Sequence, residues 1–187
     1  MKIFLLCDRK GDGPENPIRG ALMDLLTQAG HDVESVTLSR QEVMPCTSCF
    51  GCWFKTPGRC VITKDGANSV AMKQVQADAF VLLSQVTYGG FSADIKAFID
   101  RSIQVIMPFF EIYKGEMRHV MRYERLPIWV AVGYGDVCDE EKQTFIRLAD
   151  RNALNFRSQK HLALTVRDSG ELIQEGQSIL KTLEVGS

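Results

Sequence analysis

The chain has 187 residues, of which 45% are hydrophobic and 24% are charged, a composition typical of one ordinary globular domain. Its 22 basic and 23 acidic side chains give a net charge of −1, so the chain lacks the broad positive field that nucleic-acid binders use. We therefore expect a single domain over residues 1–187 that folds without a metal or a disulfide, and no nucleic-acid partner.

The first apolar run, Ile3–Cys7, is followed at once by charged residues. It is too short for the core of a signal peptide or for a membrane span, so we expect a cytoplasmic protein with no membrane association. In that reducing compartment the six cysteines are expected to be free thiols, metal ligands or redox groups rather than disulfides.

Short apolar runs and helical patterns alternate along the first third of the chain. A strand buried on both faces is expected at 2–7, and apolar residues at helical spacing predict a helix from residue 18 to a stop at Gly30. A second strand is expected at 33–38. Residues 45–60 form a cysteine-rich loop that is long for a compact domain, and long ordered loops are usually functional.

The same alternation continues beyond the cysteine-rich loop. Three further apolar runs predict strands at 79–83, 128–132 and 161–165. Helices are predicted between and after them, the first two capped by Asp65 and Ser92, at 67–75, 95–103, 139–149 and 172–183. Residues 105–127 break the alternation, and we interpret them as an excursion between a helix and a strand.

Five apolar strands that alternate with helices predict a doubly wound α/β fold, in which helices cover both faces of a parallel sheet. Ligands of such sheets bind beyond the carboxyl ends of the strands, near the point where the strand order reverses. This rule directs attention to the loops at 7–18, 84–92 and 133–139.

The loop from Ser84 to Ser92 has the composition of a site for a flat ligand. Gly89 and Gly90 let the backbone approach a ligand closely, and Tyr88 offers an aromatic face. The loop also carries several N–H donors and no charged side chain, which suits a planar, electron-accepting ring. A strand-to-helix turn whose glycines only relieve backbone strain has the same composition and stays open as an alternative.

Two segments together resemble a known family. Ser84-x-Val-x-Tyr-Gly-Gly-Phe-Ser, read with Lys96-Ala-Phe-Ile-Asp-Arg101, is similar to the flavodoxin-like FMN-dependent oxidoreductases, the group of NAD(P)H-dependent FMN reductases and iron-sulfur flavoproteins. The resemblance implies a flavodoxin-like five-stranded sheet of order 2-1-3-4-5, FMN as cofactor and NAD(P)H as co-substrate. It further implies hydride transfer to a small acceptor such as a quinone, a flavin or a nitro compound. Because the flavin carries this chemistry, no catalytic side chain is expected.

The resemblance also implies which residues hold FMN. The ring is expected between two loops, whose residues are Gln85, Val86, Thr87, Tyr88, Gly89, Gly90, Gly133, Tyr134 and Gly135. For the phosphate, a helix with free N–H groups at its start is expected beside positive side chains, and the residues assigned are Arg9, Lys10, Asn16, Pro17 and Ile18. The hydroxyls usual for the family are missing from this loop, and Asp8, Asp12 and Glu15 oppose the positive charge. We therefore expect altered or weak phosphate binding.

Four cysteines form a second motif, Cys46-x2-Cys49-x2-Cys52-x7-Cys60. Soft thiolate ligands select an iron-sulfur cluster or zinc. Because the iron-sulfur flavoproteins use a similar compact motif, the resemblance implies a 4Fe-4S cluster that exchanges single electrons with FMN and a ferredoxin-like partner. A zinc site and an aromatic packing loop around Trp53 stay open as alternatives. For the function of the whole chain, a third possibility stays open: a protein of this fold that neither binds flavin nor catalyses a reaction.

The excursion carries a group of basic residues, Arg118, His119 and Arg122. If the excursion reaches the flavin, these side chains attract the phosphate of NADPH or an anionic substrate, and the alternative is a solvated patch paired with neighbouring glutamates. Exposed aromatic residues around Trp53 and at Phe109–Phe110 predict a homodimer.

Overall fold

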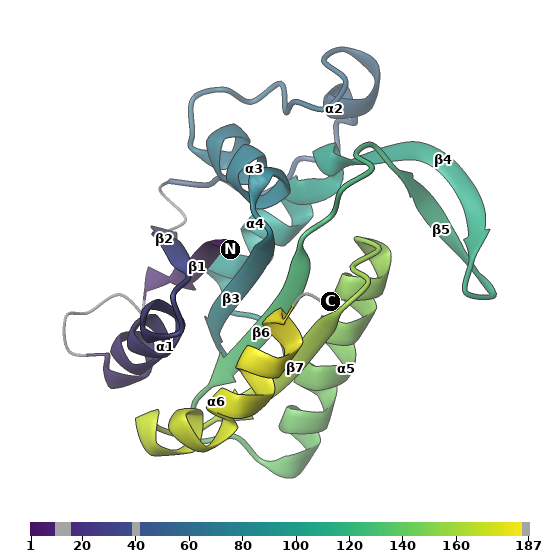
Figure 1. Ribbon diagram of the computed structural model, residues 1–187. Helices are drawn as coiled ribbons and strands as arrows, with labels where there is room; N and C mark the ends of the chain where they lie inside the picture. Colours follow the sequence, from purple (N-terminus) through teal and green to yellow (C-terminus); the bar gives the residue numbers. More distant parts are fainter. Residues whose placement is uncertain (10–15, 39–41, 185–187) are drawn as a thin grey trace.

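A five-stranded parallel sheet forms the centre of the protein (Figure 1). The computed structural model describes residues 1–9, 16–38 and 42–184. In spatial order the strands are β2 (Asp32–Leu38), β1 (Lys2–Asp8), β3 (Ala79–Gln85), β6 (Ile128–Tyr134) and β7 (His161–Val166), and all neighbours run parallel. Numbered along the chain within this sheet, the order is 2-1-3-4-5, which confirms the doubly wound, flavodoxin-like fold.

Helices cover both faces of the sheet (Figure 1). One face packs against α1 (Pro17–Gln28) and α6 (Ser169–Leu183), and the other against α3 (Ala67–Gln76), α4 (Ala93–Arg101) and α5 (Asp139–Asn155). Alternate residues of β1 serve the two faces: Ile3 and Leu5 pack on the first, Phe4 and Leu6 on the second. All four are fully buried, and burying one such side chain contributes about 1.5–3 kcal/mol. None of the helices described here is long and apolar enough to span a bilayer.

Several helix boundaries differ from the sequence-based expectation, and two of the differences are at the C-terminal ends of helices. The helix expected at 95–103 ends earlier, as α4, and the chain continues as a 3-10 turn, η2 (Ser102–Val105). The helix expected at 139–149 continues to Asn155, because Ala153 extends its buried face. Both differences lie at helix ends, where apolar periodicity carries little information.

The excursion at 105–127 contains an antiparallel hairpin, β4 (Ile106–Tyr113) and β5 (Glu116–Met121), which projects from the body of the protein (Figure 1). The pairing shifts register between Ile106 and Phe110. Such a shift interrupts the period of two along a strand. This is why sequence periodicity did not predict strands here.

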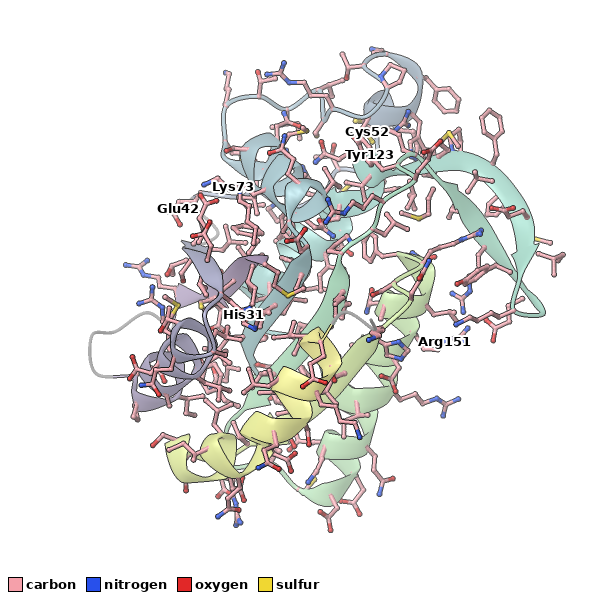
Figure 2. The ribbon with its side chains drawn as sticks, viewed as in Figure 1. His31, Glu42, Cys52, Lys73, Tyr123 and Arg151 are labelled. Atoms are coloured by element: carbon pink, nitrogen blue, oxygen red, sulfur yellow. The ribbon has the colours of Figure 1, made fainter. Side chains whose placement is uncertain are left out.

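Charged side chains attach the hairpin to α5. Glu116 accepts hydrogen bonds from the Nη1 and Nη2 atoms of Arg151 at 2.8 and 2.6 Å, and Arg157 Nη2 lies 2.7 Å from a carboxylate oxygen of Glu111. Arg151 lies on the side of α5 that faces the hairpin (Figure 2). The bonds from Arg151, and then from Arg118, lower the pKa of Glu116 to about 2. Glu116 is therefore a carboxylate at neutral pH.

Candidate functional site

The carboxylate of Asp8 joins the ends of the three central strands. Asp8 is the last residue of β1 and is only 1% exposed. Its Oδ1 accepts from the Tyr134 hydroxyl at 2.7 Å, and its Oδ2 accepts from the backbone N–H of Gln85 at 2.6 Å. Burial and then the bond to Asp8 raise the pKa of Tyr134, so the phenol remains a donor. From the sequence, Asp8 is expected only as a charge that opposes phosphate binding. The signal that could have revealed its structural role is a carboxylate at the end of a wholly apolar strand.

The chain beyond β3 forms a tight turn that presents Tyr88. Thr87 and Gly90 exchange two backbone hydrogen bonds, each 2.9 Å long. Between them Tyr88 (φ +50°) and Gly89 (φ +72°) are both left-handed, as in a type I′ turn. The N–H groups of Thr87 and Gly90 are therefore used within the turn. Those of Tyr88 and Gly89 have no acceptor among the described residues, and the Tyr88 side chain is 93% exposed.

The two predicted ring-binding segments lie side by side at the carboxyl edge. Gln85 is paired with Tyr134 in the sheet register, and Val86 N donates to Tyr134 O at 3.0 Å. Gly133 lies beneath the turn, where a Cβ atom would be 2.7 Å from Val86 Cγ2. Gly135 is partly buried, and its N–H donates to a carbonyl of β7. A platform made of the Tyr88 ring and two free N–H groups suits the polar edge and flat face of a flavin ring.

The start of α1 differs from the expected phosphate site. Asn16 caps the helix, and its Oδ1 accepts from the N–H groups of Ile18 and Arg19 at 3.0 and 3.3 Å. Pro17 has no N–H, and Gly20 N donates to Asn16 O at 3.2 Å. The free N–H groups expected here are thus already used, because the Asn16 side chain satisfies them.

The other phosphate assignments are tested less directly by the structure. Arg9 is exposed at the end of β1. Lys10 lies outside the described residues, as do residues 11–15. The role of these residues toward a phosphate remains a prediction.

The four motif cysteines line one narrow pocket together with Arg101. Cys52 and Cys60 are buried, Cys46 is partly buried and Cys49 is exposed. Figure 2 shows Cys52 at the end of the molecule that carries α2 (Gly51–Phe54). Burial raises the pKa of Cys52, and the charges of the other three thiols raise it further. The other three thiols are therefore close enough to repel a thiolate at Cys52, and a positively charged iron or zinc centre would relieve that repulsion.

Hydrogen bonds within the motif favour the thiolate of its exposed member. The backbone N–H of Gly51, followed by the Thr47 hydroxyl, lowers the pKa of Cys49. The thiolate is the form of cysteine that binds metals and attacks electrophiles. Cys49 is thus the thiol of this pocket that its surroundings prepare most directly for ligation.

The backbone around these thiols is strained. Ser48 (φ +52°) and Phe50 (φ +53°) are both left-handed without being glycine, at a cost of about 1–3 kcal/mol each. Gly51 follows, and a Cβ atom there would lie 2.5 Å from Val61 Cγ1. Such strain persists only where the surrounding structure imposes it, and it is concentrated here on the segment that wraps the pocket.

The described residues form no ready-made site for a metal ion, zinc included. A single tetrahedral zinc ion holds its thiolates ~3.8 Å apart. Among residues 1–9, 16–38 and 42–184, no three His, Cys, Asp or Glu side chains are grouped so as to hold a metal ion. A four-iron cluster is wider than one ion, so Cys46, Cys49, Cys52 and Cys60 would hold it with their sulfur atoms further apart than around zinc.

The basic residues of the excursion have partners within the excursion or beside it. His119 Nδ1 lies 2.8 Å from Met107 O, and its ring packs against Trp53 and Phe110, with centroids 5.2 and 4.3 Å away. Arg118 pairs with Glu116, and Arg122 Nε donates to a carbonyl of η2 at 3.1 Å. Arg118 is thus paired with a glutamate, as the alternative expects, whereas His119 and Arg122 contact backbone carbonyls instead.

Fold and edge together define a class of protein. A doubly wound sheet with an exposed aromatic turn at its carboxyl edge has the architecture of the flavodoxin-like flavoproteins. A family model described as NADPH-dependent FMN reductase matches residues 2–118. The chain belongs to this family of flavin-linked oxidoreductases.

Three curated relatives share sequence with the chain, and all are named iron-sulfur flavoproteins. The protein of Methanosarcina thermophila is 33% identical over 95 residues, which cover 51% of this chain and 48% of the relative. That of Methanocaldococcus jannaschii is 35% identical over 85 residues, which cover 46% of this chain and 42% of the relative. In both cases the match spans about half or less of the relative's length. The protein of Archaeoglobus fulgidus is 26% identical over 87% of this chain and 89% of its own.

Solved structures share the fold at low sequence identity. The NAD(P)H:quinone oxidoreductase of Methanothermobacter marburgensis superposes with a TM-score of 0.70 at 13% identity, covering 100% of this chain and 98% of its own. An azoreductase of Bacillus anthracis superposes with a TM-score of 0.63 at 11% identity, covering 98% of this chain and 95% of its own. At this identity the likeness establishes the fold alone.

Proposed function

We propose that this chain is an FMN-dependent oxidoreductase in which the cysteine pocket holds a 4Fe-4S cluster. The observation that carries the proposal is the convergence of Cys46, Cys49, Cys52 and Cys60 on one pocket of a flavodoxin-like chain. When bound, FMN accepts a hydride or single electrons, and the cluster exchanges single electrons. The names of the three relatives support the same combination.

The chain's own residues act by binding and orientation. When FMN is bound, the exposed ring of Tyr88 would stack on the flavin, and the free N–H groups of Tyr88 and Gly89 would donate to its polar edge. Asp8 holds the strand ends in register through Tyr134 and Gln85. No described residue has to act as an acid or a base, because the transferred electrons come from the bound groups.

The two sites lie at opposite ends of α4. Ser92 caps this helix directly after the Tyr88 turn, and Arg101 at its last position lines the cysteine pocket. From cap to last residue the helix axis spans about 14 Å. Electron transfer thus connects two places that one helix separates, with a ferredoxin-like protein as the external donor in this proposal.

A second candidate function is a reductase without a cluster. The family description favours it, because it names an NADPH-dependent FMN reductase. In this version NAD(P)H and a small acceptor, such as a quinone, a flavin or a nitro compound, use the same exposed flavin face in turn. Because both substrates would use one face in turn, this version requires ping-pong kinetics. Kinetics that show a ternary complex would exclude the shared face.

The experiment that separates the two candidates is anaerobic purification followed by absorption spectroscopy and by flavin, iron and sulfide analysis. The cluster proposal requires stoichiometric iron and a broad thiolate-to-iron band, which Cys49→Ser should abolish. Cys138→Ser is the matched control, because Cys138 is exposed and lies outside the motif. Flavin bands without iron would rule out the cluster and support the reductase. A colourless protein that does not bind added FMN would rule out both candidates.

We also propose a homodimer that uses the hairpin. Phe110 and Ile112 lie on the same face of β4, and Met117 is paired with Ile112 across the hairpin. These three side chains are 60%, 70% and 69% exposed, on an arm that projects into solvent (Figure 1). Contiguous apolar surface of this kind commonly marks a protein interface.

A further inference from the structure

A buried ion pair closes the neck of the cysteine-rich loop. The side chains of Arg101 and Asp65 are 1% and 2% exposed and meet at 2.8 Å. Arg101 also donates to the carbonyl oxygens of Met44 and Ile62, which flank the motif on either side, at 2.9 and 3.2 Å. Asp65 in turn accepts from Met44 N at 3.0 Å. The pair therefore holds both ends of the loop together.

The hydrogen bonds of Arg101 leave one donor unused. Nη1 donates to Met44 O and Asp65 Oδ2, and Nη2 donates to Ile62 O and Asp65 Oδ1. These four bonds use every terminal N–H of the guanidinium. The fifth N–H, on Nε, is buried and has no acceptor among the described residues. Buried donors are rarely left unpaired, so an unpaired one calls for a ligand.

Arg101 also forms part of the wall of the pocket of four thiols. We propose that the Arg101 Nε–H donates to an inorganic sulfide of the cluster, and that the Arg101 charge sets the reduction potential of that cluster. The inference rests on the cluster of the proposed function. A hydrogen bond to sulfur and a nearby cation both stabilise the more negative, reduced form, so both raise the potential.

Asp65 modulates this effect with the opposite sign. Its carboxylate binds the terminal nitrogens of Arg101 in a bidentate manner and so offsets part of the positive charge that the pocket experiences. Removing the Asp65 carboxylate leaves the Arg101 cation uncompensated, which raises the reduction potential. Removing the Arg101 guanidinium leaves the Asp65 anion, which lowers it. A merely structural ion pair predicts something different: either change loosens the same neck, so any effects on the cluster share one sign.

The experiment compares reduction potentials in whole chains, purified anaerobically and reconstituted with ferrous iron and sulfide. Dithionite supplies one electron per cluster, no bond is made or broken, and the reduced fraction is read by electron paramagnetic resonance at each potential. Arg101→Gln is expected to lower the reduced-to-oxidised ratio at fixed potential at least tenfold, a shift of about 59 mV for one electron. Asp65→Asn is expected to raise that ratio.

The controls separate charge from folding and the inference from the proposed function. Lys96→Gln removes an equal charge from the exposed side of the same helix, where solvent screens it, and should leave the potential unchanged. If Arg101→Gln does not fold, the double variant with Asp65→Asn removes both buried charges, and its potential should still fall below that of the unaltered chain. If Arg101→Gln has the same potential as the unaltered chain, or if both single variants shift it in the same direction, the role of Arg101 is overturned. The cluster itself is then still supported by the iron content of the unaltered chain. Absence of iron and sulfide from the unaltered chain would overturn both.

Discussion

At the scale of single residues, the carboxyl edge depends on one buried carboxylate. Asp8 provides acceptors to a phenol of β6 and to the backbone at the end of β3. Each such bond to a charged group contributes about 1.5–3 kcal/mol. The edge therefore keeps its shape through hydrogen bonds that are buried from solvent.

The raised pKa of Tyr134 predicts a pH dependence of stability. Above its ordinary value of 10.0, the unfolded state loses a proton that the folded state keeps, so the contribution is complete below pH 10 and is lost as the pH rises. Tyr134→Phe should lower the free energy of unfolding by about 1–3 kcal/mol at neutral pH. The difference from the unaltered chain should shrink above pH 10 in urea titrations. Tyr123→Phe serves as control, and a difference that stays constant with pH would contradict the assignment.

Two glycines in turns of the same kind separate backbone strain from crowding. Gly89 and Gly115 have φ angles of +72° and +79°, but only at Gly89 would a Cβ atom meet a neighbour, Thr144 Cβ at 2.7 Å. Gly115→Ala should cost about 1–2 kcal/mol, the price of the left-handed backbone alone. Gly89→Ala should cost about 2–5 kcal/mol, because overpacking is added.

The two glycine variants also test the flavin platform. Denaturant titrations give the stabilities, and fluorescence titration gives the affinity for FMN. Gly89→Ala should weaken FMN binding, since it displaces the turn that carries Tyr88, whereas Gly115→Ala should leave the affinity unchanged. Equal FMN affinity in both variants would argue that the flavin binds elsewhere.

At the scale of elements, charged pairs hold the hairpin to α5 and to the chain just beyond it, while only the base of the hairpin, at Ile106 and Met121, joins the hydrophobic core. Glu116 links Arg118 of the hairpin to Arg151 of α5, and Arg157 stacks on the Tyr113 ring at 4.2 Å. Because the pairs with Arg151 are exposed, they act on local opening more than on global stability.

Hydrogen exchange tests this attachment. Glu116→Gln should speed amide exchange in β4 and β5 without changing exchange in the central sheet. The depressed pKa means that the attachment is complete above the ordinary value of 4.5 and is lost as the pH falls toward about 2. Glu175→Gln, on the exposed side of α6, is the matched control. Unchanged exchange in the hairpin of the Glu116 variant would show that other contacts hold it.

At the scale of the whole molecule, the proposed dimer places the hairpin between two copies. Met117→Glu puts a charge on the exposed apolar face and should convert a dimer to a monomer in sedimentation equilibrium. Ile173→Glu is the matched control, because Ile173 is equally exposed, at 69%, on α6. A chain that is monomeric without any substitution would refute the dimer directly.

Several features of this protein could be predicted from the sequence because they depend on patterns that neighbouring residues carry. Apolar runs such as Ile3–Cys7 are buried in any parallel sheet, so periodicity was enough to predict the five strands, and the family resemblance supplied their order. The sequence also indicated that Tyr88 offers an aromatic face, and the ring is 93% exposed in the structure, while its role toward a flavin stays a prediction. The hairpin escaped prediction, because a register shift breaks its periodicity.

What only the tertiary structure decided is which polar groups find each other across long separations in sequence. Asn16 consumes the helix N–H groups that looked free, Asp8 meets Tyr134 from 126 residues away, and Arg101 reaches across to Asp65 with one donor left over. No local pattern encodes these meetings, because a hydrogen bond depends on the final distance and direction of two groups. Burial of apolar side chains, by contrast, is non-directional, and so the sequence by itself determined the sheet while packing decided its chemistry.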